Sequence, residues 1–193
     1  MFWQEFIALP LFIRGYVNPN ADVDLLTTVD PLAVILFQIL VSYLTRKARP
    51  MAAMTFGILI TSLSWLILAI GDLSWQLHAT LRIGSWSLSI QGLPVYAAFA
   101  LVVLAIGEMT QSPRYYEYVS RLAPSGQQGT FMGYSFLPIA IGFVIAGRMG
   151  GRLVNYFGEV LHRPNDLWFV VAAVGVVTTL LMWMYDKLVK PSE

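Results

Sequence analysis

Glu108 is the residue of this sequence whose position most clearly suggests chemistry. It is the one charged residue between Leu93 and Ser112, in a stretch that is otherwise largely apolar. A carboxylate inside hydrocarbon is costly, so such residues usually face a bundle interior or a watery cavity and serve proton relays or substrate pathways. The alternatives are a glutamate close enough to the membrane surface to reach water, or one paired with a structural arginine. We expect Glu108 to lie on a proton or substrate pathway.

A second polar spot lies near the start of the sequence. Gln4 and Glu5 interrupt an apolar run that includes Phe2, Trp3 and Phe6. If the chain begins at this point, Glu5 lies near a fraying terminus and has little importance. If the sequence is a piece of a longer protein, Glu5 lies in mid-membrane. It then becomes a second candidate for the pathway, with Gln4 beside it.

Three further residues are candidates for a hinge or a gate. Pro113 lacks the N–H that closes a helical turn and clashes with the preceding turn. It therefore either kinks a helix as a gating hinge or marks the helix end. Arg148 and Arg152 are four residues apart and share one helix face. They either anchor the outer end of that helix or form an outer gate through an ion pair with an acidic residue.

The elements that position these residues must lie in lipid. The 193 residues are 57% hydrophobic and 12% charged, whereas soluble domains are about 45–50% apolar and about 25% charged. Apolar segments cover approximately residues 1–17, 25–44, 51–71, 93–112, 130–150 and 167–185. Backbone groups in lipid must be satisfied within the segment, which makes these segments helices. We expect a single all-α polytopic membrane domain with six transmembrane helices, the first of them truncated.

Several function classes are excluded by what the sequence lacks. It has no cysteine, and its two histidines, His78 and His162, are far apart in polar stretches. No glycine-rich nucleotide loop and no nucleophile or zinc-hydrolase motif occurs. The net charge of +1 gives no basic surface for nucleic acid. We therefore expect no metal site, no cofactor, no nucleic-acid partner and no enzymatic activity.

The basic residues between the apolar segments predict the orientation. Seven of them belong to three regions that share one side: Arg46, Lys47, Arg49, Arg114, Arg121, Lys187 and Lys190. The opposite side has five, mixed with acidic residues: Arg14, Arg82, Arg148, Arg152 and Arg163. Cytoplasmic loops carry the excess of Lys and Arg. We expect an integral protein of the inner or plasma membrane with its C-terminus in the cytoplasm.

Local patterns add four expectations. Residues 72–92 form an outer interfacial hairpin with Trp75 and Trp86 at headgroup level. Residues 113–128 extend a helix beyond the membrane, and Ala123-Pro124-Ser125-Gly126 ends it. Asp30 before Pro31 is placed to cap a helix. Small residues across 129–151 favour close packing within one bundle over a dimerisation face, and aromatic residues are expected first as lipid-facing filler and interface anchors.

An ordered string of residues resembles a known family. Its members are Gly107-Glu108, Ser112-Pro113, Leu122-Ala123-Pro124, Gly129 and Met132-Gly133. The string looks like the tenth helix, cytoplasmic loop and eleventh helix of the proton-dependent oligopeptide transporters, a branch of the major facilitator superfamily. Residues 30–35 and 54–57 are similar to the eighth and ninth helices. The chain differs in having Asp30 where the family usually has Asn, and Ser135 where it often has Trp.

The resemblance implies the C-terminal six-helix half of a major facilitator bundle. In such transporters the substrate site lies near the midplane, between two six-helix halves. The implied function is half of a secondary active transporter, which moves a small solute or peptide with protons by alternating access. Its partner would be an N-terminal six-helix half. Glu108 would take part in proton or salt-bridge coupling, with Ser135 along the pathway. The alternative is a non-transporting six-helix membrane module that scaffolds a partner.

Overall fold

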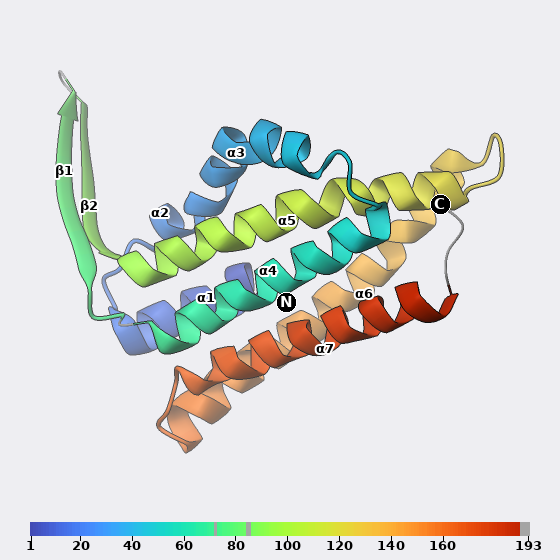
Figure 1. The fold of residues 1–193 in the computed structure, drawn as a ribbon. Coiled ribbons are helices and arrows are strands. Elements are labelled where there is room, and N and C mark those ends of the chain that lie inside the picture. The colour runs from blue at the N-terminus through green and yellow to red at the C-terminus, as the bar shows by residue number, and fades with distance from the viewer. Residues whose placement is uncertain (72, 84–85, 190–193) are drawn as a thin grey trace.

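The computed structural model describes residues 1–71, 73–83 and 86–189, with the backbone alone for residues 79–92. Helices dominate the chain, and one pair of strands interrupts them (Figure 1). In chain order the elements are α1 (Gln4–Phe12), the π-helical η1 (Ile13–Val17), α2 (Val23–Thr27), α3 (Val29–Thr45), α4 (Pro50–Ile70), β1 (Gln76–Ile83), β2 (Trp86–Pro94), α5 (Val95–Leu122), α6 (Gln128–Asn155), the π-helical η2 (Tyr156–Val160) and α7 (Asp166–Val189).

The described chain has five helical stretches long and apolar enough to cross a membrane. They are Val23–Thr45, which joins α2 to α3, then α4, α5, Gln128–Val160, which joins α6 to η2, and α7. The first apolar segment is helical from Gln4 to Val17 and is shorter than a full crossing of ~20 residues. The expected all-α polytopic architecture is confirmed, apart from the strands.

The connections between the helices gather at two ends of the bundle. The α3–α4 loop, the α5–α6 loop and the end of α7 lie at one end, and the strands and the α6–α7 connection lie at the other (Figure 1). An ion pair of 3.0 Å between Arg49 and Asp186 joins the α3–α4 loop to α7 at the first end. The basic regions grouped from the sequence therefore do share one end, although Lys190 lies outside the described residues. That this end faces the cytoplasm stays a prediction.

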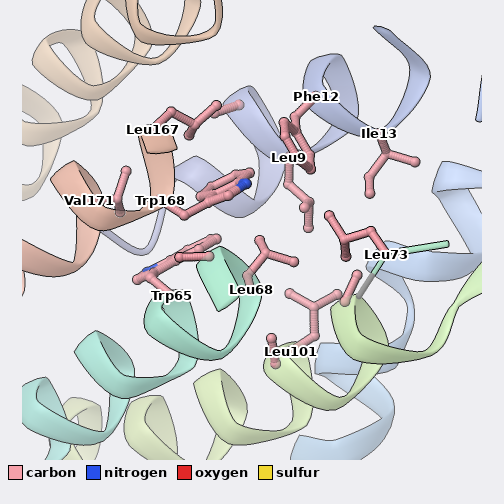
Figure 2. Packing of buried hydrophobic residues seen from close by; sticks show 14 of the residues in the cluster. Leu9, Phe12, Ile13, Trp65, Leu68, Leu73, Leu101, Leu167, Trp168 and Val171 are labelled. Atoms are coloured by element: carbon pink, nitrogen blue, oxygen red, sulfur yellow. The ribbon is translucent and has the colours of Figure 1, made fainter. Parts of the chain in front are cut away.

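The main hydrophobic core lies near the end that carries the strands (Figure 2). Trp65 of α4 and Trp168 of α7 stack with ring centroids 5.0 Å apart and 5° between their planes. Phe12 of α1 meets Trp168 edge-on at 5.2 Å. Leu68 and Leu101 pack beside these rings and bring in α5. The core therefore ties α1, α4, α5 and α7 together at one end of the bundle.

The long loop after α4 forms an antiparallel β-hairpin that projects from the bundle (Figure 1). Thr80 pairs with Ser89, and the register shifts between Leu77 and Ala79. We expected a hairpin here, and the apolar residues at every second position from Leu77 to Ile83 are typical of the strand that forms. Trp75 is exposed and lies 6.1 Å from the Tyr96 ring. The side chain of Trp86 lies outside the described residues, so headgroup placement of these rings stays a prediction.

Asp30 does not cap a helix, contrary to the expectation from the sequence. Asp22 does so instead, because its carboxylate accepts a hydrogen bond of 3.0 Å from the backbone N–H of Leu25 at the start of α2. Asp30 lies eight residues further on, in the first turn of α3, whose N-cap residue is Thr28. The chain starts its helix earlier than the Asp-Pro pair suggested, and this carries Asp30 into the bundle.

Pro113 does not mark a helix end. Helix α5 continues through it to Leu122, where Ala123 is the C-cap residue. The expected extension of this helix as far as Ala123 is confirmed. The structure therefore excludes the helix end, one of the two roles considered for Pro113, and the hinge stays a prediction.

The small residues of α6 pack differently from the expectation. An added Cβ would meet no atom within 4 Å at Gly129, Gly133, Gly147 or Gly151, which share one face of the helix, as judged from the described residues. Gly150 is the exception, because Gln4 and Ile7 of α1 lie against it. Most of this glycine face is therefore uncovered within the chain, and the expectation of close packing within one bundle is wrong there.

Candidate transport site

The position of Glu108 is set by a close contact between α4 and α5. Gly57 and Gly107 face each other across the two helices. A Cβ added at Gly107 would lie 2.8 Å from the carbonyl oxygen of Gly57, and the Thr61 hydroxyl would be nearer still. Two glycines let helices approach closely in a membrane. Because Glu108 follows Gly107 directly, this contact fixes where its carboxyl group lies.

Glu108 lines a cavity of about 740 Å³ between α4, α5, α6 and α7, with Phe2 and Trp3 from the residues before α1. Among the lining residues it is the one that carries a formal charge. Gln111, Ser112, Tyr115 and Tyr116 follow it along α5. These five residues recur at the helical spacing that places side chains on one face. One face of α5 therefore supplies most of the polar groups of the cavity.

A second cavity of about 390 Å³ lies on the other side of Glu108, toward α3. Val34 and Gln38 of α3 line it together with Glu108, Ser112 and Pro113 of α5. Glu108 therefore borders both cavities. Pro113 lies next to the second one, four residues after Met109, whose carbonyl would otherwise accept a hydrogen bond from the N–H at position 113.

Two more carboxyl groups lie near Glu108 in the interior. Glu5 of α1 is fully buried, and neither of its carboxylate oxygens has a hydrogen-bond partner among the described residues. Asp30 is also buried, with one oxygen unpartnered in the same sense. Glu5, Asp30 and Glu108 are all within electrostatic reach of one another. In the described part of the chain these acidic groups are not arranged to hold a metal ion.

The burial of Glu5 leads to a prediction with an internal control. Replacing Glu5 by methionine is expected to stabilise the isolated chain by about 1–3 kcal/mol, because a buried group without partners is removed. Gln4→Met should destabilise it, because the Gln4 side-chain amide donates a 3.1 Å hydrogen bond to the Ala146 carbonyl of α6. Thermal unfolding in detergent, followed by circular dichroism, measures both changes. A lower melting temperature for Glu5→Met would show that Glu5 has a partner.

Gln4 and Ser135 are buried but do not line either cavity. Gln4 links α1 to α6 through Ala146. The Ser135 hydroxyl donates to the Met132 carbonyl of its own helix at 2.7 Å, and the Ser135 carbonyl accepts from the Tyr115 hydroxyl at 2.9 Å. Both residues therefore hold helices together, and a place on the pathway remains a proposal for them.

Arg148 and Arg152 are exposed near the far end of α6. Neither forms an ion pair with any residue that the structure describes. Arg152 lies in the last turn of the helix, where a cation is favoured by the helix dipole. The structure places Glu5 within electrostatic reach of Glu108, and neither arginine forms an ion pair with these carboxyl groups.

The sequence analysis missed two features of the site. Asp30 was expected to cap a helix, and residues 113–128, which include Tyr115 and Tyr116, were expected to extend a helix beyond the membrane. Tyr115 and Tyr116 in fact line the larger cavity. The sequence contains a signal for this, because Tyr115 and Tyr116 follow Glu108 by seven and eight residues and therefore share its helix face.

The described chain is thus a bundle of apolar helices of membrane-spanning length around a cavity with one carboxyl group. The model of the POT family (PTR2) matches residues 17–160. This chain belongs to the POT family, within the major facilitator superfamily, and is an integral membrane protein. The family resemblance inferred from the Glu108 to Gly133 string is thereby confirmed.

Individual relatives agree with this assignment. The chain is 29% identical over 172 residues to the uncharacterised MFS-type transporter YttB of Bacillus subtilis, covering 88% of this chain and 37% of that protein. It is 32% identical over 114 residues to the multidrug resistance protein MdtH of Cronobacter sakazakii, covering 58% of this chain and 28% of MdtH. The first of these relatives is named as a transporter, and the second is named for multidrug resistance.

A solved structure shows the same fold. A POT family transporter in complex with 5-aminolevulinic acid superposes on 96% of this chain with a TM-score of 0.63 and 18% identity, and the match covers 39% of that transporter. The chain thus spans less than two-fifths of the length of each of these relatives.

Proposed function

We propose that this chain is the C-terminal half of a proton-coupled secondary transporter that moves a small solute or peptide. The observation that carries the proposal is Glu108, a carboxyl group that borders both cavities and has no ion-pair partner among the described residues. Two carboxyl groups, Asp30 and Glu5, are within electrostatic reach of it, and they favour uptake of a proton or a cation. In this proposal Glu108 changes its protonation as two six-helix halves rock about the site.

An N-terminal six-helix half is the partner that the geometry supports. The glycine face of α6 is uncovered, and the matched relatives are more than twice as long as the chain. Such a half would close the larger cavity from the side that this chain leaves unfilled. Pro113 would act as a hinge in α5, and Arg148 and Arg152 would lie at the outer face. The C-terminus would lie in the cytoplasm.

Proton-driven uptake tests the proposal. The chain is joined to its N-terminal half and reconstituted in vesicles with an inward proton gradient, with dialanine and 5-aminolevulinic acid as probes. The wild type should accumulate at least one of them. Glu108→Gln should reduce accumulation to the level of empty vesicles, while exchange of the probe across the membrane without a gradient persists. The matched control is Glu159→Gln, an exposed position whose side chain still accepts a hydrogen bond from Tyr16.

Two outcomes would contradict parts of the proposal. Full gradient-driven uptake by Glu108→Gln would remove the coupling role of this residue. If the chain by itself forms a stable complex with a different protein and transports nothing when joined to its other half, it is the scaffolding module instead. The uncovered glycine face of α6 is the feature that such a module would use.

A further inference from the structure

The register of the β-hairpin separates its residues into an apolar face and a polar face. The apolar cross-strand pairs are Leu77 with Leu93, Ala79 with Ile90, Leu81 with Leu88, and Ile83 with Trp86. The pairs that alternate with them in the outer part, Thr80 with Ser89 and Arg82 with Ser87, are polar. Opposed residues of antiparallel strands share a face, and successive residues alternate between faces. The hairpin is therefore amphipathic from its base to Ile83 and Trp86.

The base of the hairpin is fixed to the bundle. The Asn18 side-chain amide donates a 3.0 Å hydrogen bond to the Gln76 side-chain oxygen at the start of β1. The backbone N–H of Val95 donates to the Trp75 carbonyl at 3.1 Å, where the two strands meet the helices. Strand β2 also contacts α2 and α5. The direction of the hairpin is therefore tied to the direction of the helices.

The hairpin runs across the helices, and its tip lies beyond them (Figure 1). Helices α4 and α5 run along the bundle, and both strands turn away from that direction at one of its ends. Because the helices are long enough to cross the bilayer, an element that runs across them at one end lies along the membrane surface. At ~3.3 Å per residue, strands of this length reach ~25–30 Å, well beyond the ~10 Å width of one helix.

The apolar face is the one on the side of the bundle. Leu93 belongs to this face and packs against the main hydrophobic core. Since the bundle lies in the membrane, the side of the hairpin that meets the bundle is also the side that meets the bilayer further out. Ile70 and Phe99, on the two helices that hold the hairpin, are 75% and 56% exposed. The apolar outer surface of the bundle therefore extends to the helix ends next to the hairpin.

We propose that the hairpin is a membrane-docking element, which lies on the bilayer beside the bundle with its apolar face against the lipid. Amphipathic elements bury such a face ~5–10 Å deep, at the boundary of headgroups and acyl chains. Trp75 and Tyr96 at the base, with ring centroids 6.1 Å apart, are of the residue types enriched at this level. A two-stranded hairpin is marginally stable at best in water, so lipid contact also explains how the strands stay paired away from the bundle. The proposal goes beyond headgroup placement of two tryptophans, because it assigns each face of the hairpin a different neighbour.

Fluorescent labels on the two faces test this assignment. The chain has no cysteine, so Leu88→Cys and Ser89→Cys each provide a single labelling position. Each variant carries the dye NBD and is placed in phosphatidylcholine nanodiscs at one chain per disc, alone and joined to its N-terminal half. Lipid with a nitroxide high on the acyl chain should quench the Leu88 label about twofold or more, as an interfacial depth requires. Iodide in the water should instead quench the Ser89 label, and the pattern should be the same in both preparations.

A matched pair of charged variants tests whether the apolar face holds the hairpin on the lipid. The label is placed on that face through Ile90→Cys. Adding Leu88→Asp should abolish quenching of this label by the nitroxide lipid and allow quenching by iodide, because a carboxylate is costly to bury in the bilayer. Adding Ser89→Asp introduces the same residue on the polar face of the same strand. It should leave the lipid quenching unchanged.

Four results would overturn the assignment. Equal lipid quenching at Leu88 and Ser89 would mean that neither face is turned to the bilayer, and iodide quenching alone at Leu88 would mean that the hairpin stands in water. Shielding of the Leu88 label from both quenchers would mean that protein covers this face; if it occurs only in the joined chain, that protein is the N-terminal half. Lipid quenching that survives Leu88→Asp would mean that the apolar face does not hold the hairpin in place.

Discussion

Replacing Trp168 by alanine is expected to lower the free energy of unfolding of the chain by about 3–5 kcal/mol, the cost of a large cavity in a packed core. The Trp168 ring is fully buried, stacks on Trp65 and meets the edge of Phe12. It therefore joins α7 to both α4 and α1. Its loss removes dispersion contacts from three helices at once, and these contacts count even where lipid is the solvent.

Trp183 provides the matched control on the same helix. Its side chain is 54% exposed, and its one described ring contact is a distant lysine, Lys187, at 6.0 Å. Trp183→Ala should change stability by no more than about 0.5 kcal/mol. Thermal unfolding of both variants in the same detergent, followed by far-ultraviolet circular dichroism, gives the comparison. Equal melting temperatures for the two would mean that the aromatic core does not hold the bundle together.

Gly107→Ala is expected to destabilise the chain by about 1–3 kcal/mol, although it adds one methyl group. That methyl would meet the Thr61 hydroxyl and the backbone of Gly57, and α4 and α5 would have to separate. Since Glu108 is the next residue, its carboxyl group would move with α5. We therefore expect a loss of proton-driven uptake in addition to the loss of stability.

The control for this substitution is Gly133→Ala in α6. No described atom lies within 4 Å of a Cβ at that position. Alanine is favoured over glycine in a helix by up to about 1 kcal/mol, so this variant should be as stable as the wild type or more stable. The two glycine variants, measured in the same way, should differ in sign. The same change for both would contradict the close α4–α5 contact.

The membrane class of this protein follows from its sequence, because hydropathy is a local property. Uncharged runs such as Pro50–Ile70 are long and apolar enough to cross a membrane. In lipid, a helix satisfies their backbone hydrogen bonds within the segment. Glu108 could be found in the same way, as a lone charge in an apolar run. The end of α5 after Leu122 could also be predicted from a local signal, because the sequence Ala-Pro-Ser-Gly does not continue a helix.

The site around Glu108 could not be predicted in full, because it depends on which helix faces meet. The Asp30-Pro31 pair suits the start of a helix, yet α3 begins before Asp30. Asp30 is buried in the bundle, where α3 packs against α5. Glu5 lies near the start of the sequence, where fraying was as reasonable as burial. The distances between these carboxyl groups depend on how α1, α3 and α5 pack together, and the sequence of any one helix does not determine them.

The sequence by itself therefore determined that lipid surrounds this protein, that its apolar segments are helical, and that one carboxyl group, Glu108, interrupts an apolar segment. The tertiary structure alone decided that Glu5 and Asp30 accompany Glu108, that aromatic side chains form the wall of its cavity, and that most glycines of α6 are left uncovered. The physical reason is that hydropathy and turn signals act over a few residues. Burial, cavity shape and electrostatic reach arise only when residues distant in the sequence are packed together.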